Sequence, residues 1–326
     1  MAQLLAGVET IPIEKYVRDV LPHSFALWGD GRTFERYAED FRAVAGSTYG
    51  KRRPFTIGIR EAGQTICSCK NYDRELRWED SALRATGIGA VFTPPPMRGR
   101  GYATLMLGAL LDSERDAGRD LAFLYSDIHP AFYEKLGFKA VPSRSIALRA
   151  ASLDGSPCGS APLEAKDWPA VRRCFEALDA TRPWSLRRTP LVWDWMRRRF
   201  EAPVAAGEQA VRLVVRRERA VLAYAIGRRV PKRDAFVIDD FGFDGDAVRQ
   251  LVAPLLRAAA GDLGRVAGWL PPPGAREALP RGSVRARKGA ILMLAPLSAR
   301  ARTWWNRNAE AILAGRADAT WSADHV

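Results

Sequence analysis

Two spacings of hydrophobic residues alternate along the first 150 residues. Short apolar runs predict strands, and stretches in which apolar residues recur every three or four positions predict amphipathic helices. The clearest helix is predicted over Gly101–Ala117, with Leu105, Leu107, Leu110 and Leu111 on its apolar side. The predicted order is helices at 16–28 and 33–44, a hairpin at 55–60 and 65–70, a strand at 83–93, the 101–117 helix, a strand at 121–128, a short helix from 130 and a strand at 143–149. This order predicts an α/β domain with a mixed sheet.

The second half of the chain repeats this order more loosely. Helices are predicted at 167–180, 190–200 and 246–260, and strands at 211–215, 221–228, 235–243, 265–270 and 290–294. Residues 151–162 between the halves are rich in Ser, Gly and Pro, which is typical of a linker. We therefore predict two domains of similar build in tandem. Their expected limits are 1–150 and 163–297, with a linker at 151–162 and a tail at 298–326.

Composition narrows the class of protein. The net charge is +13, but 42 of the 50 basic residues are Arg and they are spread along the chain. This excess is typical of a genome-wide coding bias, so a nucleic-acid partner is not favoured. The sequence contains no run of 18 uncharged apolar residues, the length that a membrane-spanning helix needs. The first residues also lack a secretory signal pattern. We therefore expect a cytoplasmic protein. The four cysteines have neither zinc-site nor disulfide spacing, and no metal is expected.

The segment GAVFTPPPMRGRGYA, residues 89–103, carries the strongest chemical signal. A predicted strand ends at three prolines, and a glycine-rich turn then opens the 101–117 helix. Main-chain N–H groups at a helix start, together with the positive end of the helix dipole, form an anion site. The flanking Arg98 and Arg100 add positive charge. The segment is therefore suited to a pyrophosphate, although a structural turn uses the same residues.

A second motif lies about thirty residues further on. After the apolar run LAFLYSDI, the sequence PAFYEKLGF places Tyr133 four residues before Gly137, which Phe138 follows. Together with the turn, this motif resembles the GCN5-related N-acetyltransferase (GNAT) superfamily. In that family Gln/Arg-x-x-Gly-x-Gly/Ala binds the coenzyme A pyrophosphate, and the matching residues here are Arg98, Gly99, Arg100, Gly101, Tyr102 and Ala103.

The resemblance implies roles for further residues. Ala90, Val91, Phe92 and Thr93 occupy the family's bulged strand, whose backbone pairs with the pantetheine arm of acetyl-coenzyme A. Ser126 replaces a frequent Asn that touches the same substrate. Tyr133 matches the tyrosine that protonates the departing thiolate. A phenol with a pKa near 10 can donate to a developing thiolate whose thiol has a pKa of about 8.5.

The base that accepts the proton of the amine is left open by the sequence. Family members often use a carboxylate on the strand before the turn, but residues 83–93 contain none. Asp127, on the neighbouring strand, is the first candidate, and His129, one helical turn before Tyr133, is the second. Some tandem relatives instead bring a C-terminal carboxylate into the active site, and the ending WSADHV is compatible with this.

The second half lacks an equivalent anion site. After AFVIDDFGF come Asp244, Gly245 and Asp246, whose carboxylates would repel phosphate at a helix start. We therefore predict one GNAT-like catalytic domain and one degenerate GNAT-like domain without a pyrophosphate loop. A narrower resemblance to fungal lysine N-acetyltransferases, carried by VFTPPPMRGRGYA and LYSDIHPAFYEKLGF, makes a small primary amine such as lysine the expected acceptor. The alternatives are an acetyl-coenzyme A sensor without activity and an acyltransferase acting on a protein or nucleic acid.

Overall fold

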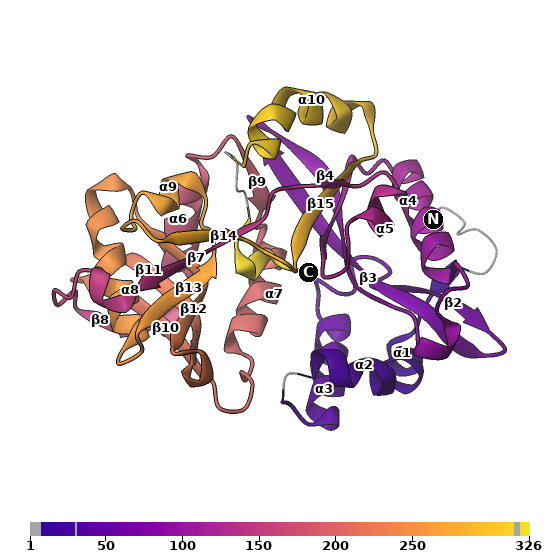
Figure 1. Ribbon diagram of the computed structural model, residues 1–326, viewed down its shortest axis with the longest axis horizontal. Coiled ribbons are helices and arrows are strands. Elements are labelled where there is room, and N and C mark those ends of the chain that lie inside the picture. Colours follow the sequence, from indigo (N-terminus) through magenta and orange to yellow (C-terminus); the bar gives the residue numbers. More distant parts are fainter. Residues whose placement is uncertain (1–7, 30, 316–319) are drawn as a thin grey trace.

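The computed structural model describes residues 8–29, 31–315 and 320–326, which form two mixed β-sheets lying side by side (Figure 1). The first sheet has the order β1-β2-β3-β4-β5-β15-β6, with β9 on the same edge of β3 as β2, and the second has the order β14-β7-β13-β12-β11-β10-β8. The strands of the first sheet are β1 (Val8–Thr10), β2 (Thr56–Glu61), β3 (Gln64–Trp78), β4 (Ser81–Phe92), β5 (Leu121–Ser126), β6 (Lys139–Ala140), β9 (Trp184–Arg187) and β15 (Ile291–Pro296). Those of the second are β7 (Arg144–Arg149), β8 (Ser160–Pro162), β10 (Gln209–Arg217), β11 (Ala220–Val230), β12 (Ala235–Phe243), β13 (Arg265–Trp269) and β14 (Ser283–Ala286).

The two halves of the sequence exchange strands. β7, which ends the first half, pairs with β13 and β14 in the second sheet. β15, from the second half, lies between β5 and β6, and β9 continues the edge of β3 beyond β2. Each sheet is therefore completed by strands from the other half. The division into domains at 1–150 and 163–297 stays a prediction, and the last residues of the predicted linker form β8.

Helices cover both faces of the first sheet. The residues Met106, Leu107 and Leu110 of α4 share a core with Tyr133 on one face, while Trp304 and Ile312 of α10 pack on the other. α6 and α8 pack on β11 and β12 of the second sheet. The helices are α1 (Ile13–Asp19), α2 (Leu21–Trp28), α3 (Phe34–Gly46), α4 (Tyr102–Asp116), α5 (Ala131–Glu134), α6 (Trp168–Asp179), α7 (Pro190–Glu201), α8 (Val252–Ala260), α9 (Pro273–Arg276) and α10 (Ala299–Leu313).

Three details of the predicted pattern are wrong. The helix expected at 16–28 is divided into α1 and α2, because Pro22 lacks an N–H group and fits only the first turn of a new helix. Leu105 is 53% exposed, and Met106 takes its place in the core. Ile128 lies beyond the end of β5 and is 54% exposed, because the strand ends at Ser126.

Within the described ranges, no helix is both long and apolar enough to cross a bilayer. In the same residues, no three His, Cys, Asp or Glu side chains are grouped as metal ligands. The four cysteines are free thiols, and Cys67, Cys69 and Cys174 are buried.

Candidate active site

A bulge in β4 separates this strand from β5. Lys70 of β3 pairs with Gly89 and Ser68 pairs with Phe92, so that Ala90 and Val91 together lie opposite one residue of β3. Ala90 has a φ of 46°, which a non-glycine residue adopts only at a cost.

The parallel pairing of β4 with β5 ends near this bulge. The last pair is Ile88 with Leu124, although β4 continues to Phe92 and β5 to Ser126. Past this pair, the edge of β4 that faces β5 presents main-chain groups without a strand partner. The bulge implied by the resemblance is therefore present at Ala90 and Val91, and β4 ends at Phe92, one residue before Thr93. Binding of the pantetheine arm there stays a prediction.

The glycine-rich turn places free N–H groups at the start of α4. Gly99 and Gly101 have φ angles of 78° and 80°, and a Cβ on either residue would meet no atom within 4 Å. Within the described part of the chain, no group accepts a hydrogen bond from the main-chain N–H groups of residues 99–104. The side chain of Arg98 donates from Nε to the carbonyl oxygen of Thr93 at 3.0 Å, and Arg100 is exposed. The turn is an open cradle of donors bordered by two cations.

The remaining residues predicted to bind the acyl donor lie in the first turn of α4, just after β4 and at the end of β5. Tyr102 and Ala103, half-buried, form the first turn of α4. The hydroxyl of Thr93 donates to Cys67 Sγ at 3.2 Å. Ser126 is buried, donating from Oγ to the Ile128 carbonyl oxygen at 2.8 Å and accepting from the Ile128 N–H at 3.3 Å. Its hydroxyl is thus already engaged in closing the turn after β5.

Tyr133 lies on the same face of the first sheet as α4. Its side chain is 7% exposed and packs edge-on against the rings of Phe132 and Phe138, with centroids 4.9 and 6.0 Å away. Burial raises the pKa of Tyr133 to about 12, with smaller contributions from Cys69 and Asp127. The phenol therefore holds its proton at neutral pH and can act as a donor.

The two candidate bases each accept a hydrogen bond from a main-chain N–H group. Asp127 is exposed, and its Oδ1 accepts from the Ala290 N–H at 2.8 Å, which holds the loop before β15. His129 is exposed as well, and its Nδ1 accepts from the Ala131 N–H at 3.3 Å at the start of α5. One acceptor atom of each side chain is thus engaged by the main chain.

The last residues of the sequence pass between the two sheets to reach β4 (Figure 1). A Cβ built on Gly89 would lie 2.6 Å from the carbonyl carbon of Val326 and 2.8 Å from its oxygen. Only glycine leaves room for this approach. In a chain that ends at Val326, the group beside Gly89 is a carboxylate. From the sequence, a C-terminal carboxylate in the active site was suggested only by the resemblance to some tandem relatives.

A buried cluster of charges holds this segment in place. Asp324, in the 3₁₀ turn Ser322–Asp324, accepts from Arg188 Nε at 3.1 Å and from Arg74 Nη2 at 3.3 Å. Arg188 also pairs with Asp240 of β12. Burial favours a higher pKa for Asp324, but Arg188 and Arg74 hold it below its ordinary value. Burial raises the pKa of Asp240 to about 6.

Sequence reasoning missed this cluster. Arg74 lies in a stretch where polar and apolar residues alternate, and this pattern predicts a side chain that faces solvent. The available signal was the pair Asp239 and Asp240 inside the apolar strand AFVIDDFGF, since a buried carboxylate requires a cation.

His325 continues the segment inside an aromatic pocket. Its ring lies 5.1 Å from that of Tyr125 and 5.8 Å from that of Trp269. Burial and the charge of Arg199 lower the pKa of His325 to about 4. Arg199 of α7 donates to the His325 carbonyl oxygen at 2.7 Å.

The corresponding turn of the second half differs. After β12, Asp246 begins the 3₁₀ helix η5 (Asp246–Leu251), and its carboxylate pairs with Arg249. The carboxylate in this acidic turn is thus paired with a side chain of the same turn, whereas the 98–103 turn is open.

Comparison with known proteins agrees with this geometry. Residues 14–141 match the family model of the acetyltransferase (GNAT) domain. A lysine acetyltransferase of Yarrowia lipolytica is 28% identical over 148 residues, which make up 37% of this chain and 38% of that protein. The chain thus covers well under half of this curated relative.

Solved structures share the fold across both halves. A GCN5-related N-acetyltransferase from Anabaena variabilis superposes with a TM-score of 0.71 at 15% identity, covering 90% of this chain and 73% of that one. Saccharomyces cerevisiae N-myristoyltransferase with bound myristoyl-CoA gives 0.54 at 10% identity, covering 90% and 83%. These likenesses establish a GNAT fold arranged in tandem.

Proposed function

Because residues 14–141 form an acetyltransferase domain of the GNAT family, we propose that this chain transfers an acetyl group from acetyl-coenzyme A to a primary amine. One observation carries the proposal. Free N–H groups of residues 99–104 follow the end of β4, where pairing with β5 has already stopped, and Arg98 Nε donates to the Thr93 carbonyl oxygen just past that strand. An anion cradle and an open strand edge together suit a pyrophosphate followed by a pantetheine arm.

The cradle is suited to the pyrophosphate in shape and charge. Main-chain N–H groups at a helix start and the helix dipole favour an anion. The open space above Gly99 and Gly101 admits phosphate oxygens close to the backbone. Arg98 and Arg100 supply the counter-charge.

The bulge at Ala90 and Val91 would receive the arm and the thioester. The N–H and C=O groups on the free edge of β4 can pair with pantetheine amides in the manner of a strand. An N–H at this edge would also polarise the thioester carbonyl, which stabilises the negative charge that develops as the amine attacks. Positioning of the two substrates supplies much of the remaining rate gain.

Tyr133 is proposed to protonate the leaving thiolate. The amine nitrogen bonds to the carbonyl carbon, the C–S bond breaks, and sulfur takes the phenolic proton. The raised pKa keeps the tyrosine protonated until this step.

For the proton of the amine, we propose the carboxylate of Val326 in a chain that ends there. It lies beside Gly89, whereas Asp127 already accepts a hydrogen bond from Ala290. Adding two glycines after Val326 converts the carboxylate to an amide and should lower kcat, while Asp127→Asn should leave kcat nearly unchanged. The reverse pattern would assign the base to Asp127, the first candidate from the sequence, and His129→Gln tests the second.

The expected acceptor is a small amine, with lysine as the first compound to test. This follows the Yarrowia lipolytica relative, which is a lysine acetyltransferase. A mixture of small amines incubated with the protein and acetyl-coenzyme A, analysed by mass spectrometry with free-thiol detection, identifies the acceptor. Binding of acetyl-coenzyme A without thiol release from any amine would instead indicate a sensor, and acetylation of proteins or nucleic acids alone a macromolecular acyltransferase.

A pair of matched variants tests the cradle. Gly101→Asp puts a carboxylate at the N-cap of α4, where it repels phosphate. The φ of 80° strains any side chain at this position, so the control has to carry a similar strain. Gly245 has a similar φ of 84° and equally open space before η5. Calorimetry should find that Gly101→Asp abolishes acetyl-coenzyme A binding while Gly245→Asp does not. Equal binding by both variants would refute the proposed site.

A further inference from the structure

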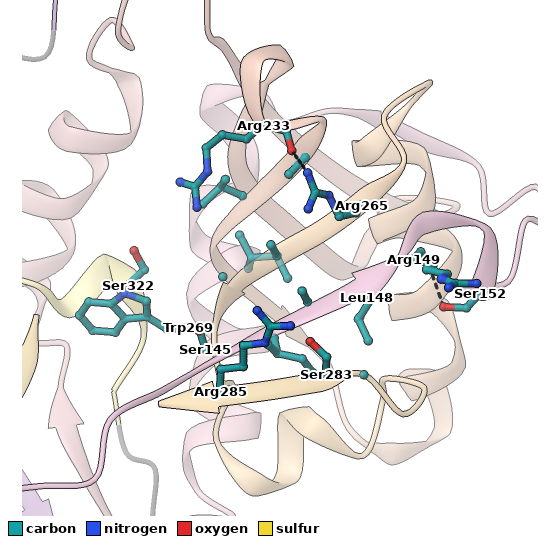
Figure 2. Close-up of a pocket in the computed structure, with 18 of the residues that line it drawn as sticks. Ser145, Leu148, Arg149, Ser152, Arg233, Arg265, Trp269, Ser283, Arg285 and Ser322 are labelled. Carbon is teal, nitrogen blue, oxygen red and sulfur yellow. Dashed lines mark hydrogen bonds between the residues drawn. The ribbon is translucent and has the colours of Figure 1, made fainter. Parts of the chain in front are cut away.

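The second sheet carries a hollow of about 890 Å³ that the proposed acetyl transfer does not use (Figure 2). It lies over β7, β13 and β12, and β14 borders one side. Side chains of these strands alternate between the two faces of the sheet. Val266 and Phe236 point into the core, whereas Ser145, Ala267 and Val237 line the hollow. Ile146 belongs to the core and also borders the hollow.

Six arginines border this hollow, and no Asp or Glu lines it. They come from strands β7, β11, β13 and β14 and from two turns, namely Arg149, Arg228, Arg233, Arg265, Arg281 and Arg285. Figure 2 shows Arg233 and Arg265 on one side, Arg285 and Ser283 on the other, and Trp269 with Ser322 at one end. Folding thus brings these six arginines, which are dispersed in the sequence, around one hollow.

Most of these charges lack an internal counter-ion. Arg228 pairs with Glu208 at 3.3 Å, and Arg265 donates to the main-chain oxygen of Arg233. Over the parts of the chain that the structure covers, the guanidinium groups of Arg149, Arg233 and Arg285 make neither an ion pair nor a hydrogen bond. Arginines elsewhere, such as Arg216 with Asp167, meet carboxylates.

Clustering like charges around a concavity is electrostatically costly, and an anionic ligand removes that cost. Guanidinium groups bind phosphate in a bidentate manner. Four serines line the hollow; the hydroxyls of Ser152 and Ser322 donate to Arg149 O and Asp239, and those of Ser145 and Ser283 can donate to a ligand. The volume lies within the range of small-molecule sites. The Trp269 ring at one end adds an aromatic surface.

From this arrangement we propose that the hollow binds a small organic polyanion of nucleotide size that carries two or more phosphate groups. The site is independent of the acetyl-coenzyme A cradle, which lies at the start of α4 in the other sheet. The occupant would lie with its phosphates among Arg149, Arg233 and Arg285.

Calorimetric titration of the full chain with adenosine triphosphate and with inorganic tripolyphosphate tests the proposal. One-to-one binding of adenosine triphosphate is expected, with tripolyphosphate weaker. The triple variant Arg149→Gln, Arg233→Gln, Arg285→Gln removes charge without removing an internal bond, and should weaken binding by roughly tenfold for each arginine that contacts phosphate. The control is Arg300→Gln with Arg302→Gln, two exposed arginines of α10, which should change nothing.

Further measurements separate this site from other anion sites. Binding should persist in Gly101→Asp, because the α4 cradle is not involved, and failure of the acetyl-transfer proposal would leave this result unaffected. Loss of binding in Gly101→Asp but not in the triple variant would overturn the inference. Equal loss of binding in the triple and control variants would also overturn it, as would no binding of adenosine triphosphate at all. The inference would fail as well if a 12-nucleotide single strand or an acidic peptide bound more tightly than adenosine triphosphate. If the triple variant fails to fold, Arg285→Gln on the edge strand β14 replaces it.

Discussion

The carbonyl group of Val326 lies against Gly89, so closely that a methyl group on Gly89 would fall 2.6 Å from the Val326 carbonyl carbon. This contact joins the end of the described chain to the strand that borders the proposed thioester site. It also requires that 320–326 pass between the two sheets, where Asp324 is bound by Arg74 and Arg188.

Replacing Gly89 by Ala should displace Val326 while leaving the anion cradle intact. We expect kcat to fall by roughly 100-fold, because a shift of about 1 Å in a catalytic group has that effect. Binding of acetyl-coenzyme A, measured by calorimetry, should be unchanged. Gly108→Ala in α4, where a Cβ meets no atom within 4 Å, is the control and should add about 1 kcal/mol of stability. Normal kcat in Gly89→Ala would exclude a catalytic role for this contact.

Tyr133→Phe removes the proposed proton donor and keeps the ring that packs between Phe132 and Phe138. We expect kcat to fall by about 10²-fold or more, as is typical when a general acid is lost, with no change in the acetyl-coenzyme A dissociation constant. Steady-state kinetics with thiol detection and calorimetry measure the two quantities. A kcat within twofold of the parent protein would show that the leaving thiolate does not need this phenol.

Asp324→Asn should destabilise the protein strongly. It leaves the buried guanidinium groups of Arg74 and Arg188 without the carboxylate that lies between them, which costs about 3–5 kcal/mol in comparable cases. Asp246, whose side chain is 80% exposed and which pairs with Arg249, provides the matched control. Asp246→Asn should change the free energy of unfolding by about 0–1 kcal/mol. Chemical denaturation compares the variants, and similar losses in both would argue against a special role for the buried cluster.

His325 should make stability depend on pH. Its folded-state pKa of about 4 lies below the ordinary value of 6.5, because the ring is buried and lies near Arg199. The stabilising effect is fully present above pH 6.5 and is lost as the pH falls toward 4, since the unfolded chain binds a proton that the folded chain does not. The loss should reach about 3 kcal/mol at most.

The comparison of His325→Gln with the parent protein isolates this effect. The variant should lose less stability between pH 7 and pH 4.5 in urea unfolding experiments. His23→Gln, at an exposed position of α2, should follow the parent curve. Parallel curves for His325→Gln and the parent protein would contradict the assignment.

Local sequence alone determined much of the fold and the cradle. The order of helices and strands follows from the spacing of apolar residues, and β12 begins and ends at the predicted residues. The 98–103 turn was visible because its chemistry depends on consecutive residues: two glycines with positive φ and the N–H groups of the helix that follows. Errors arose where one residue decided the outcome, as Pro22 did in dividing α1 from α2.

Tertiary structure decided everything that depends on residues distant in the sequence. The exchange of β7 and β15 between the sheets, the contact of Val326 with Gly89, and the cluster of Asp324 with Arg74 and Arg188 each join segments far apart along the chain. The arginines around the hollow are likewise dispersed until the strands align. Hydrophobic periodicity reports which face of an element is buried, but it carries no information about which distant element will cover that face, and this pairing is what builds both proposed sites.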